Sequence, residues 1–279
     1  MNGNNMIWPA ELNLVRHGQS NYNILKALKA ADPDYQVFKR LYNRWDARCE
    51  KGDWMREPPK SELVELAIQM RKKYSLGCSD PETPLTEMGI WQAQQTGKAL
   101  AEFIEIPDVI FVSPYKRTWQ TFENVKMFCP QFHGVKIREE DRIREQEHGL
   151  CALYNDWRIY HVFHPEQRAM FRLAGKYDYC FPGGENIARA RDRVRRWFDK
   201  LIRDYPGKRV WGFTHHLTKL TIMGLLKHWS QEQFLWWDTH RVPPNLSVTT
   251  FRGTNTGKIE IELPEYGKIY YDQSKYAPA

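Results

Sequence analysis

Short apolar runs alternate with longer amphipathic segments along most of this chain, and the alternation predicts an α/β fold. Each run is brief and bounded by polar residues or proline, as is typical of a buried strand. The apolar runs lie at 12–15, 108–112 and 209–213, and a further strand is expected near 135–138. Helical patterns begin near Ser20, extend from an N-cap at Thr86 to about Phe103, and end before Pro130 and near Ile202. This order predicts a three-layer sandwich with a mostly parallel central sheet.

Residues 25–80 do not follow the alternation, and we interpret them as a helical insertion after the first strand. A helix is expected within it from about Glu62 to Tyr74. The segment as a whole is expected to form a cap over the carboxyl end of the sheet, whereas its individual basic side chains are expected to be solvated. These are Lys26, Lys29, Lys39, Arg40, Arg44, Arg48 and Lys51. Later in the chain, the runs 246–251 and 258–261 flank an Asn/Gly turn and predict a hairpin.

The chain has 279 residues and a formal net charge of +7. No linker, repeat or low-complexity tract divides it, so a single domain over 1–279 is expected to carry the insertion. The positive charge favours anionic partners, which include phosphorylated metabolites and nucleic acid. Five arginines could form a nucleic-acid stripe, but they interleave with apolar residues at helical spacing and are expected on the solvent face of a helix. They are Arg189, Arg191, Arg193, Arg195 and Arg196. A nucleic-acid partner is therefore not expected.

The cysteines are scattered, odd in number and free of any Cys-x-x-Cys pair, so reduced thiols are expected rather than a disulfide framework or a zinc site. They are Cys49, Cys78, Cys129, Cys151 and Cys180. His161 and His164 have a spacing that metal ligands on a helix can have, but no third ligand accompanies them, and core or surface roles are expected. No leader-like or membrane-length apolar segment is recognisable, so the protein is expected to be soluble and cytoplasmic, without a membrane partner.

Side chains that suit a phosphate group follow three of the predicted strands. Arg16 and His17 come directly after the first, Arg117 lies in the helix that follows the second, and His215 follows the fourth. Because the carboxyl ends of parallel strands share one edge of a sheet, two arginines and two histidines could converge on one tetrahedral anion. A helix beginning near Ser20 would direct backbone N–H groups at the same anion. His17 is then the candidate nucleophile.

An ordered series of short motifs extends along nearly the whole chain, apart from the segment after Leu25 and the last residues. The first are Arg16-His17-Gly18-Gln19-Ser20 with Asn23, Pro84-Leu85-Thr86-x-x-Gly89 with Gln92-Ala93, and Ser113-Pro114 with Arg117 and Gln120-Thr121. The later ones are Arg144-Glu145-Gln146-Glu147-His148-Gly149, Pro182-Gly183-Gly184-Glu185-Asn186 and Phe213-Thr214-His215. Taken in order, these motifs resemble the histidine phosphatase superfamily, also called the phosphoglycerate mutase-like proteins, and in particular its phosphatase-type branch.

The resemblance implies a phosphohistidine mechanism. His17 would attack phosphorus, while Arg16, Arg117 and His215 would stabilise charge on the phosphoryl oxygens. Glu145, at the family's acidic position, would protonate the leaving oxygen and later deprotonate the attacking water. The family also implies contacts to phosphate or substrate from Asn23 and Glu185, the latter as a structural or substrate-positioning residue. No metal and no organic cofactor is implied for a phosphatase.

The acidic loop 145–149 resembles the shorter loops of phosphatase-like members, and the longer basic segment of the cofactor-dependent mutases is missing. A phosphomonoesterase acting on a small phosphorylated molecule is therefore expected. Phosphoglycerate mutase, which would use 2,3-bisphosphoglycerate, is the alternative, and a catalytically weak module that binds a phosphorylated ligand is the second alternative. Two positions depart from the family, because Cys180 stands where phosphatase-like relatives tend to have Arg and His216 where many have Gly. The cation missing at Cys180 could come from Arg158, Arg168, Arg172 or a lysine of the insertion.

Overall fold

The computed structural model describes residues 8–48, 58–253, 259–260 and 266–277. Two compact units are formed, which we call the sheet unit and the helical unit. The sheet unit comprises the described residues of Met1–Ser20, Pro81–Glu145 and Ala190–Ala279, and the helical unit those of Asn21–Asp80 and Gln146–Arg189. The segment interpreted as an insertion therefore shares its unit with a second stretch, which the hydrophobic pattern did not assign to it.

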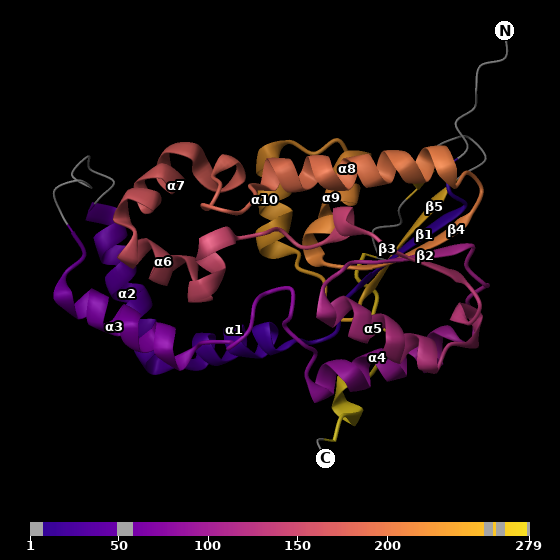
Figure 1. Cartoon of the computed structure of the whole chain (residues 1–279), viewed down its shortest axis with the longest axis horizontal. Coiled ribbons are helices and arrows are strands. Elements are labelled where there is room, and N and C mark those ends of the chain that lie inside the picture. The colour runs from indigo at the N-terminus through magenta and orange to yellow at the C-terminus, as the bar shows by residue number, and fades with distance from the viewer. Residues whose placement is uncertain (1–7, 49–57, 254–258, 261–265, 278–279) are drawn as a thin grey trace, which may run out of the picture. The chain divides into compact units, whose positions relative to one another are not determined.

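A six-stranded sheet in the order β3-β2-β4-β1-β5-β6 forms the centre of the sheet unit (Figure 1). The strands are β1 (Glu11–Arg16), β2 (Val109–Val112), β3 (Lys136–Glu139), β4 (Arg209–Thr214), β5 (Val248–Gly253) and β6 (Ile259–Glu260). The first four pair in parallel, and β5 and β6 add antiparallel strands beside β1. The mostly parallel sheet and the pairing of the late hairpin are confirmed. The hairpin's turn at 254–258 lies outside the described residues.

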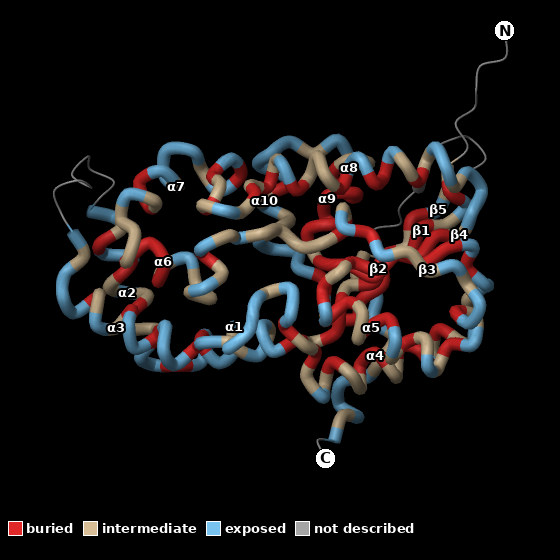
Figure 2. The backbone as a smooth tube through the Cα atoms, in the orientation of Figure 1, coloured by how far each residue is buried: buried red, intermediate tan, exposed pale blue. Residues whose placement is uncertain are grey.

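Helices cover both faces of this sheet, so the three predicted layers are confirmed (Figure 1). One face carries α4 (Glu87–Leu100) and α5 (Lys116–Met127), and the other carries α8 (Ile187–Asp204) and α9 (His216–Leu226), which is followed by α10 (Gln231–His240). Side chains along β4 alternate between the two faces of the sheet. Val210 packs against the α8 side, whereas Trp211 and Phe213 pack against the α4 side. The inner strands β1, β2 and β4 are consequently buried along most of their length (Figure 2), whereas no residue of the edge strand β3 is fully buried.

The N-terminus of α4 is capped as predicted. The Thr86 hydroxyl accepts a hydrogen bond from the backbone N–H of Gly89 at 3.1 Å, which satisfies one of the helix's unpaired donors. The helix ends at Leu100, earlier than the predicted Phe103, because the chain tightens there into a turn in which the N–H of Phe103 bonds to the carbonyl of Leu100. Short 3₁₀ turns connect other elements. They are η2 (Pro130–Phe132), η3 (Asp141–Ile143), η4 (Gly149–Tyr154) and η6 (Gln273–Lys275).

The helical unit contains α1 (Asn21–Ala31), α2 (Pro33–Arg48), α3 (Ser61–Lys73), α6 (Trp157–Phe163) and α7 (Pro165–Asp178). The helix expected near 62–74 is confirmed as α3. The core of the helical unit is largely aromatic, with Phe38, Tyr42 and Trp45 of α2 fully buried. The expectation of solvated charges was wrong for Lys29, which is 6% exposed. Its ammonium group binds the carbonyl of Asn155 and the carboxylate of Asp156, and this pairing compensates the loss of hydration.

Within the described residues, no helix is long and apolar enough to cross a membrane. The four described cysteines, Cys78, Cys129, Cys151 and Cys180, are free thiols, as expected. Cys49 lies outside the described residues.

Candidate active site

The strand order places the three chemistry-bearing strand ends side by side, because β2, β4 and β1 are neighbours in the sheet. Arg16 at the end of β1 is in register with Thr214 at the end of β4. Beyond the strands the backbone pairing continues: the N–H of His17 bonds to the Thr214 carbonyl, and the N–H of Ser113 to the Phe213 carbonyl, both at 3.0 Å. The residues that directly follow these strands are therefore held at one edge of the sheet.

His17 is a buried, neutral imidazole with one defined lone pair. Its side chain is 5% exposed, and Nδ1 lies 2.8 Å from the carbonyl oxygen of Gly18. A carbonyl oxygen only accepts, so Nδ1 carries the proton and Nε2 carries the lone pair. Burial, followed by the positive charges of Arg117 and Arg16, lowers the pKa of His17 well below its ordinary value. Nε2 is thus an available nucleophile at neutral pH.

His215 lies next to His17, with 5.2 Å between the ring centroids. It is fully buried, and its Nε2 lies 2.8 Å from the Ser113 hydroxyl. Burial and the charge of Arg117 lower the pKa of His215 well below its ordinary value, so this ring is neutral as well. The edge of Tyr115 packs against it at 5.0 Å between centroids.

Arg16 and Arg117 supply the positive charge of the site. Arg117, in the first turn of α5, is 4% exposed, and its guanidinium carbon lies 4.7 Å from the centre of the Tyr115 ring. Arg16 donates from Nη1 to the carbonyl of Pro243. Burial lowers the pKa of Arg16, and the carboxylate of Glu145 acts in the opposite direction. The structure therefore brings together Arg16, His17, Arg117 and His215, and Glu145 lies within electrostatic reach of Arg16.

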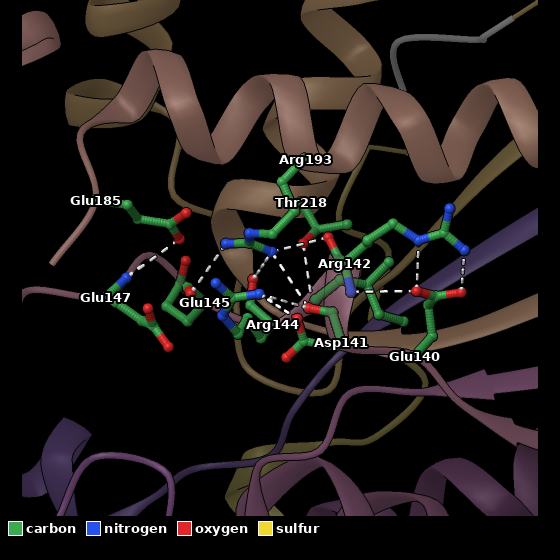
Figure 3. A network of polar contacts seen from close by, with 10 residues as sticks. Glu140, Asp141, Arg142, Arg144, Glu145, Glu147, Glu185, Arg193 and Thr218 are labelled. Carbon is green, nitrogen blue, oxygen red and sulfur yellow. Dashed lines mark hydrogen bonds and ion pairs between the residues drawn. The ribbon is translucent and has the colours of Figure 1, made fainter.

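The loop that carries Glu145 is anchored by Arg193 of α8 (Figure 3). Its guanidinium donates to the carbonyls of Arg142 at 2.8 Å, Arg144 at 3.1 Å and Glu145 at 3.3 Å. The expectation that the arginines of this helix are solvated holds for Arg195, which is exposed and paired with Asp192. It was wrong for Arg193, because the backbone carbonyls of this irregular loop require hydrogen-bond donors, which a helix side chain can provide.

A loop after α10 supports the nucleophile and was missed by the sequence reasoning. The side-chain amide of Asn245 donates to the carbonyls of His17 at 3.0 Å and Gly18 at 3.2 Å. The fully buried Lys219 of α9 donates to the carbonyl of Ser247, which follows in the same loop, at 2.9 Å. Two signals were present in the sequence: the residues Pro-Pro-Asn before β5, which are typical of a turn, and a lysine within α9, whose other residues are mainly apolar.

Asn23 and Glu185 belong to the helical unit. Asn23 lies in the first turn of α1. The carboxylate of Glu185 accepts a hydrogen bond from the backbone N–H of Glu147 at 3.3 Å (Figure 3), and its backbone N–H donates to the Glu147 carbonyl at 2.8 Å. Glu185 thus holds the segment that follows Glu145.

The other residues considered in the sequence analysis contact protein groups outside the cluster of Arg16, His17, Arg117 and His215. Arg168 and Arg172, considered as replacements for a cation at Cys180, both bind Asp46. The Cys180 thiol itself lies 3.2 Å from the carbonyl of Gly184. The imidazole of His216 is 3.1 Å from the Asp238 carboxylate. His161 is fully buried against Tyr42, and His164 contacts Tyr154, which confirms the core and surface roles expected for this pair. Among the described residues, no cluster of three potential metal ligands occurs.

Comparison with known proteins agrees with this geometry. The chain is 25% identical over 278 residues to the phosphoglycerate mutase-like protein AT74 of Arabidopsis thaliana, an alignment that covers 96% of this chain and 68% of that protein. It is 29% identical over 167 residues to a 2,3-bisphosphoglycerate-dependent phosphoglycerate mutase of Parvibaculum lavamentivorans, covering 59% of this chain and 77% of the relative. The fold matches that of the α-ribazole phosphatase of Shigella flexneri with a TM-score of 0.62 at 15% identity, over 93% of this chain and 98% of the other. Residues 71–263 match the family model of the histidine phosphatase superfamily (branch 1), and the chain belongs to this superfamily.

Proposed function

We propose that this protein is a phosphomonoesterase that hydrolyses a small phosphorylated molecule through a phosphohistidine intermediate on His17, with Glu145 as the proton donor. The observation that carries the proposal is the buried, neutral His17 beside Arg16 and Arg117, with its proton held on Nδ1 by Gly18. A nucleophilic lone pair next to two fixed cations suits attack on a phosphate dianion, because the cations stabilise charge on the phosphoryl oxygens.

In the first half-reaction, Nε2 of His17 forms a bond to phosphorus while the bond from phosphorus to the ester oxygen breaks. The carboxyl group of Glu145 transfers its proton to that oxygen, so the alcohol leaves as a neutral molecule. Arg16, Arg117 and His215 hold the three oxygens of the transferring group. The products are the free alcohol, phosphohistidine at His17 and an ionised Glu145.

In the second half-reaction, water takes the place of the alcohol. The carboxylate of Glu145 accepts a proton from the water as its oxygen bonds to phosphorus, and the bond from phosphorus to Nε2 breaks. Inorganic phosphate leaves, and His17 and Glu145 regain their starting protonation states. This scheme uses no metal or organic cofactor, so we expect turnover to continue in EDTA.

The same half-reactions serve a mutase when a phosphorylated alcohol, rather than water, receives the group. The short acidic loop favours hydrolysis, whereas the Parvibaculum relative is described as a mutase. The proposed substrate is a soluble metabolite, and the protein is proposed to act in the cytoplasm without nucleic acid or membrane partners.

The test measures phosphate release over a panel of phosphorylated metabolites and phosphopeptides, with and without 2,3-bisphosphoglycerate. Rapid quenching in alkali should trap phosphohistidine in the wild type and in His133→Ala, which alters an exposed histidine, but not in His17→Ala. Undiminished hydrolysis by His17→Ala would contradict the assignment of His17 as the nucleophile. Interconversion of phosphoglycerates that depends on the bisphosphate and releases no phosphate would identify a mutase, and saturable binding without turnover would identify a binding module.

A further inference from the structure

Of the two ring nitrogens of the buried His215, one contacts Ser113 and the other has no hydrogen-bond partner among the described residues. Nε2 lies 2.8 Å from the Ser113 hydroxyl, and both side chains are fully buried. Nδ1 is also buried, and no hydrogen-bond partner for it occurs among the described residues. An unpaired buried nitrogen costs free energy, so it calls for an explanation, and at this position beside His17 a bound ligand provides one.

A neutral imidazole has one N–H, so the hydroxyl decides which nitrogen carries it. If Ser113 donates, Nε2 is the acceptor and the proton is on Nδ1. If Ser113 accepts, the proton is on Nε2, and Nδ1 presents a lone pair. Phosphoryl oxygens are acceptors, so only the first arrangement allows Nδ1 to bind them.

The backbone of Ser113 is fixed by hydrogen bonds on both sides. The N–H of Ser113 bonds to the carbonyl of Phe213 at 3.0 Å, and its carbonyl accepts from the Thr118 hydroxyl at 2.9 Å. Both ends of the residue are thus tied to the sheet and to α5. From this anchored backbone the hydroxyl reaches Nε2 of His215 at 2.8 Å.

We propose that Ser113 is a positioning residue whose hydroxyl donates to Nε2 of His215 and so keeps the proton on Nδ1, where it binds an oxygen of the phosphoryl group. The assignment of the bound oxygen rests on the proposed phosphatase function. The two histidines then have different roles: His17 presents a lone pair at Nε2 as the nucleophile, and His215 presents an N–H at Nδ1 as a hydrogen-bond donor. Gly18 fixes the first tautomer and Ser113 the second.

The tautomer can be read directly in the full-length protein without any turnover. Selective ¹⁵N labelling of histidine and long-range ¹H–¹⁵N correlation distinguish a protonated ring nitrogen from one with a lone pair, and the His215→Gln variant identifies the signals of His215. The wild type should show a protonated Nδ1. In Ser113→Ala the Nε2–H form should gain population, and Ser113→Thr, which keeps the hydroxyl, should restore the wild-type pattern.

Binding of inorganic phosphate supplies the second measurement. Loss of a hydrogen bond to a charged ligand predicts about 10- to 100-fold weaker binding in Ser113→Ala, with near-normal binding in Ser113→Thr. A protonated Nε2 of His215 in the wild type overturns the proposal, whether or not the variant folds. A tautomer that is unchanged in folded Ser113→Ala overturns it as well. Absence of hydrolysis by the wild type would instead contradict the proposed function and leave the tautomer result standing.

Discussion

Arg193 of α8 donates a hydrogen bond from its guanidinium to the backbone carbonyl of Glu145 at 3.3 Å. The same group binds two preceding carbonyls, so one helix side chain fixes the loop that carries the candidate proton donor (Figure 3). A general acid must lie within hydrogen-bond reach of the oxygen that it protonates, and a small displacement of its loop has a large effect on the rate.

Arg193→Gln is therefore expected to impair the protonation of the leaving oxygen. For an alkyl phosphate, whose leaving oxygen requires a proton, kcat should fall about 10- to 100-fold. For p-nitrophenyl phosphate, which releases a stable anion, the fall should be about threefold or less. Steady-state kinetics on both substrates measure the difference.

Arg195→Gln is the matched control, because Arg195 lies on the same helix but is exposed and paired with Asp192. It should leave both rates near those of the wild type. Equal losses on the two substrates in Arg193→Gln would show that Arg193 supports the fold of the site in general and not the acid.

Burial and the charges around His17 keep its imidazole neutral. Because burial and the charges of Arg117 and Arg16 lower this pKa, His17 stays neutral as the pH falls through 6.5, its ordinary value. In an NMR titration, with its signals assigned by His17→Ala, the imidazole of His17 should therefore remain neutral well below that pH. Removing a positive charge in Arg117→Gln raises the pKa of His17, so its titration should move to higher pH, while the rate of hydrolysis falls about 100- to 1,000-fold.

Lys116→Gln removes the same charge from the adjacent, exposed position and should leave the titration of His17 unchanged. Protonation of the His17 ring near pH 6.5 in the wild type, or the same titration in wild type and Arg117→Gln, would contradict the electrostatic account of the neutral nucleophile.

Gly89 is expected to tolerate no side chain. The first turn of α4 packs against the turn that follows β1, and the N–H of Thr86 bonds to the Gln19 carbonyl at 2.9 Å. A Cβ at Gly89 would lie 2.1 Å from that carbonyl oxygen. Gly89→Ala should lower the free energy of unfolding by about 1–3 kcal/mol and reduce activity by shifting the nucleophile's turn. Chemical denaturation measures the first effect, and Glu87→Ala, on the exposed side of the same turn, should cost about 1 kcal/mol or less.

The sheet could be predicted because its inner strands β1, β2 and β4 are short, mainly apolar runs followed by polar residues, and parallel strands require crossover helices. The same logic placed Arg16, His17, Arg117 and His215 at one edge, which the neighbouring positions of β2, β4 and β1 confirm. Pattern alone gave no indication that 146–189 packs with the insertion, because that pairing depends on contacts between distant segments.

Support for the site was harder to foresee than the site itself. Arg193 resembles its solvated neighbours in spacing, and only the three carbonyls opposite distinguish it. Asn245 acts through backbone atoms of His17 and Gly18, which no residue pattern identifies. A side chain that binds backbone carbonyls is specified by the path of the partner chain, and that path exists only in the folded protein.

His161 in the helical unit couples stability to pH. Burial lowers its pKa to about 3, and its Nδ1 is paired with the Tyr42 hydroxyl at 3.1 Å. Between pH 6.5 and about 3 the unfolded chain binds a proton at this residue that the folded chain does not, so stability falls as the pH falls. The contribution of this residue is a loss of about 1.4 kcal/mol per pH unit across that window and none above it.

His161→Gln retains a polar partner for Tyr42 but cannot titrate. Its free energy of unfolding should decline less steeply than that of the wild type between pH 6 and pH 4, by about 1.4 kcal/mol per pH unit, in urea denaturation followed by tryptophan fluorescence. His17 and His215 also have lowered pKa values, but they contribute equally to both proteins and cancel in the difference. His133→Gln, at an exposed position, should follow the wild-type slope. Parallel pH profiles for wild type and His161→Gln would mean that the folded protein takes up the proton without cost, which requires water or an anion to reach the buried ring.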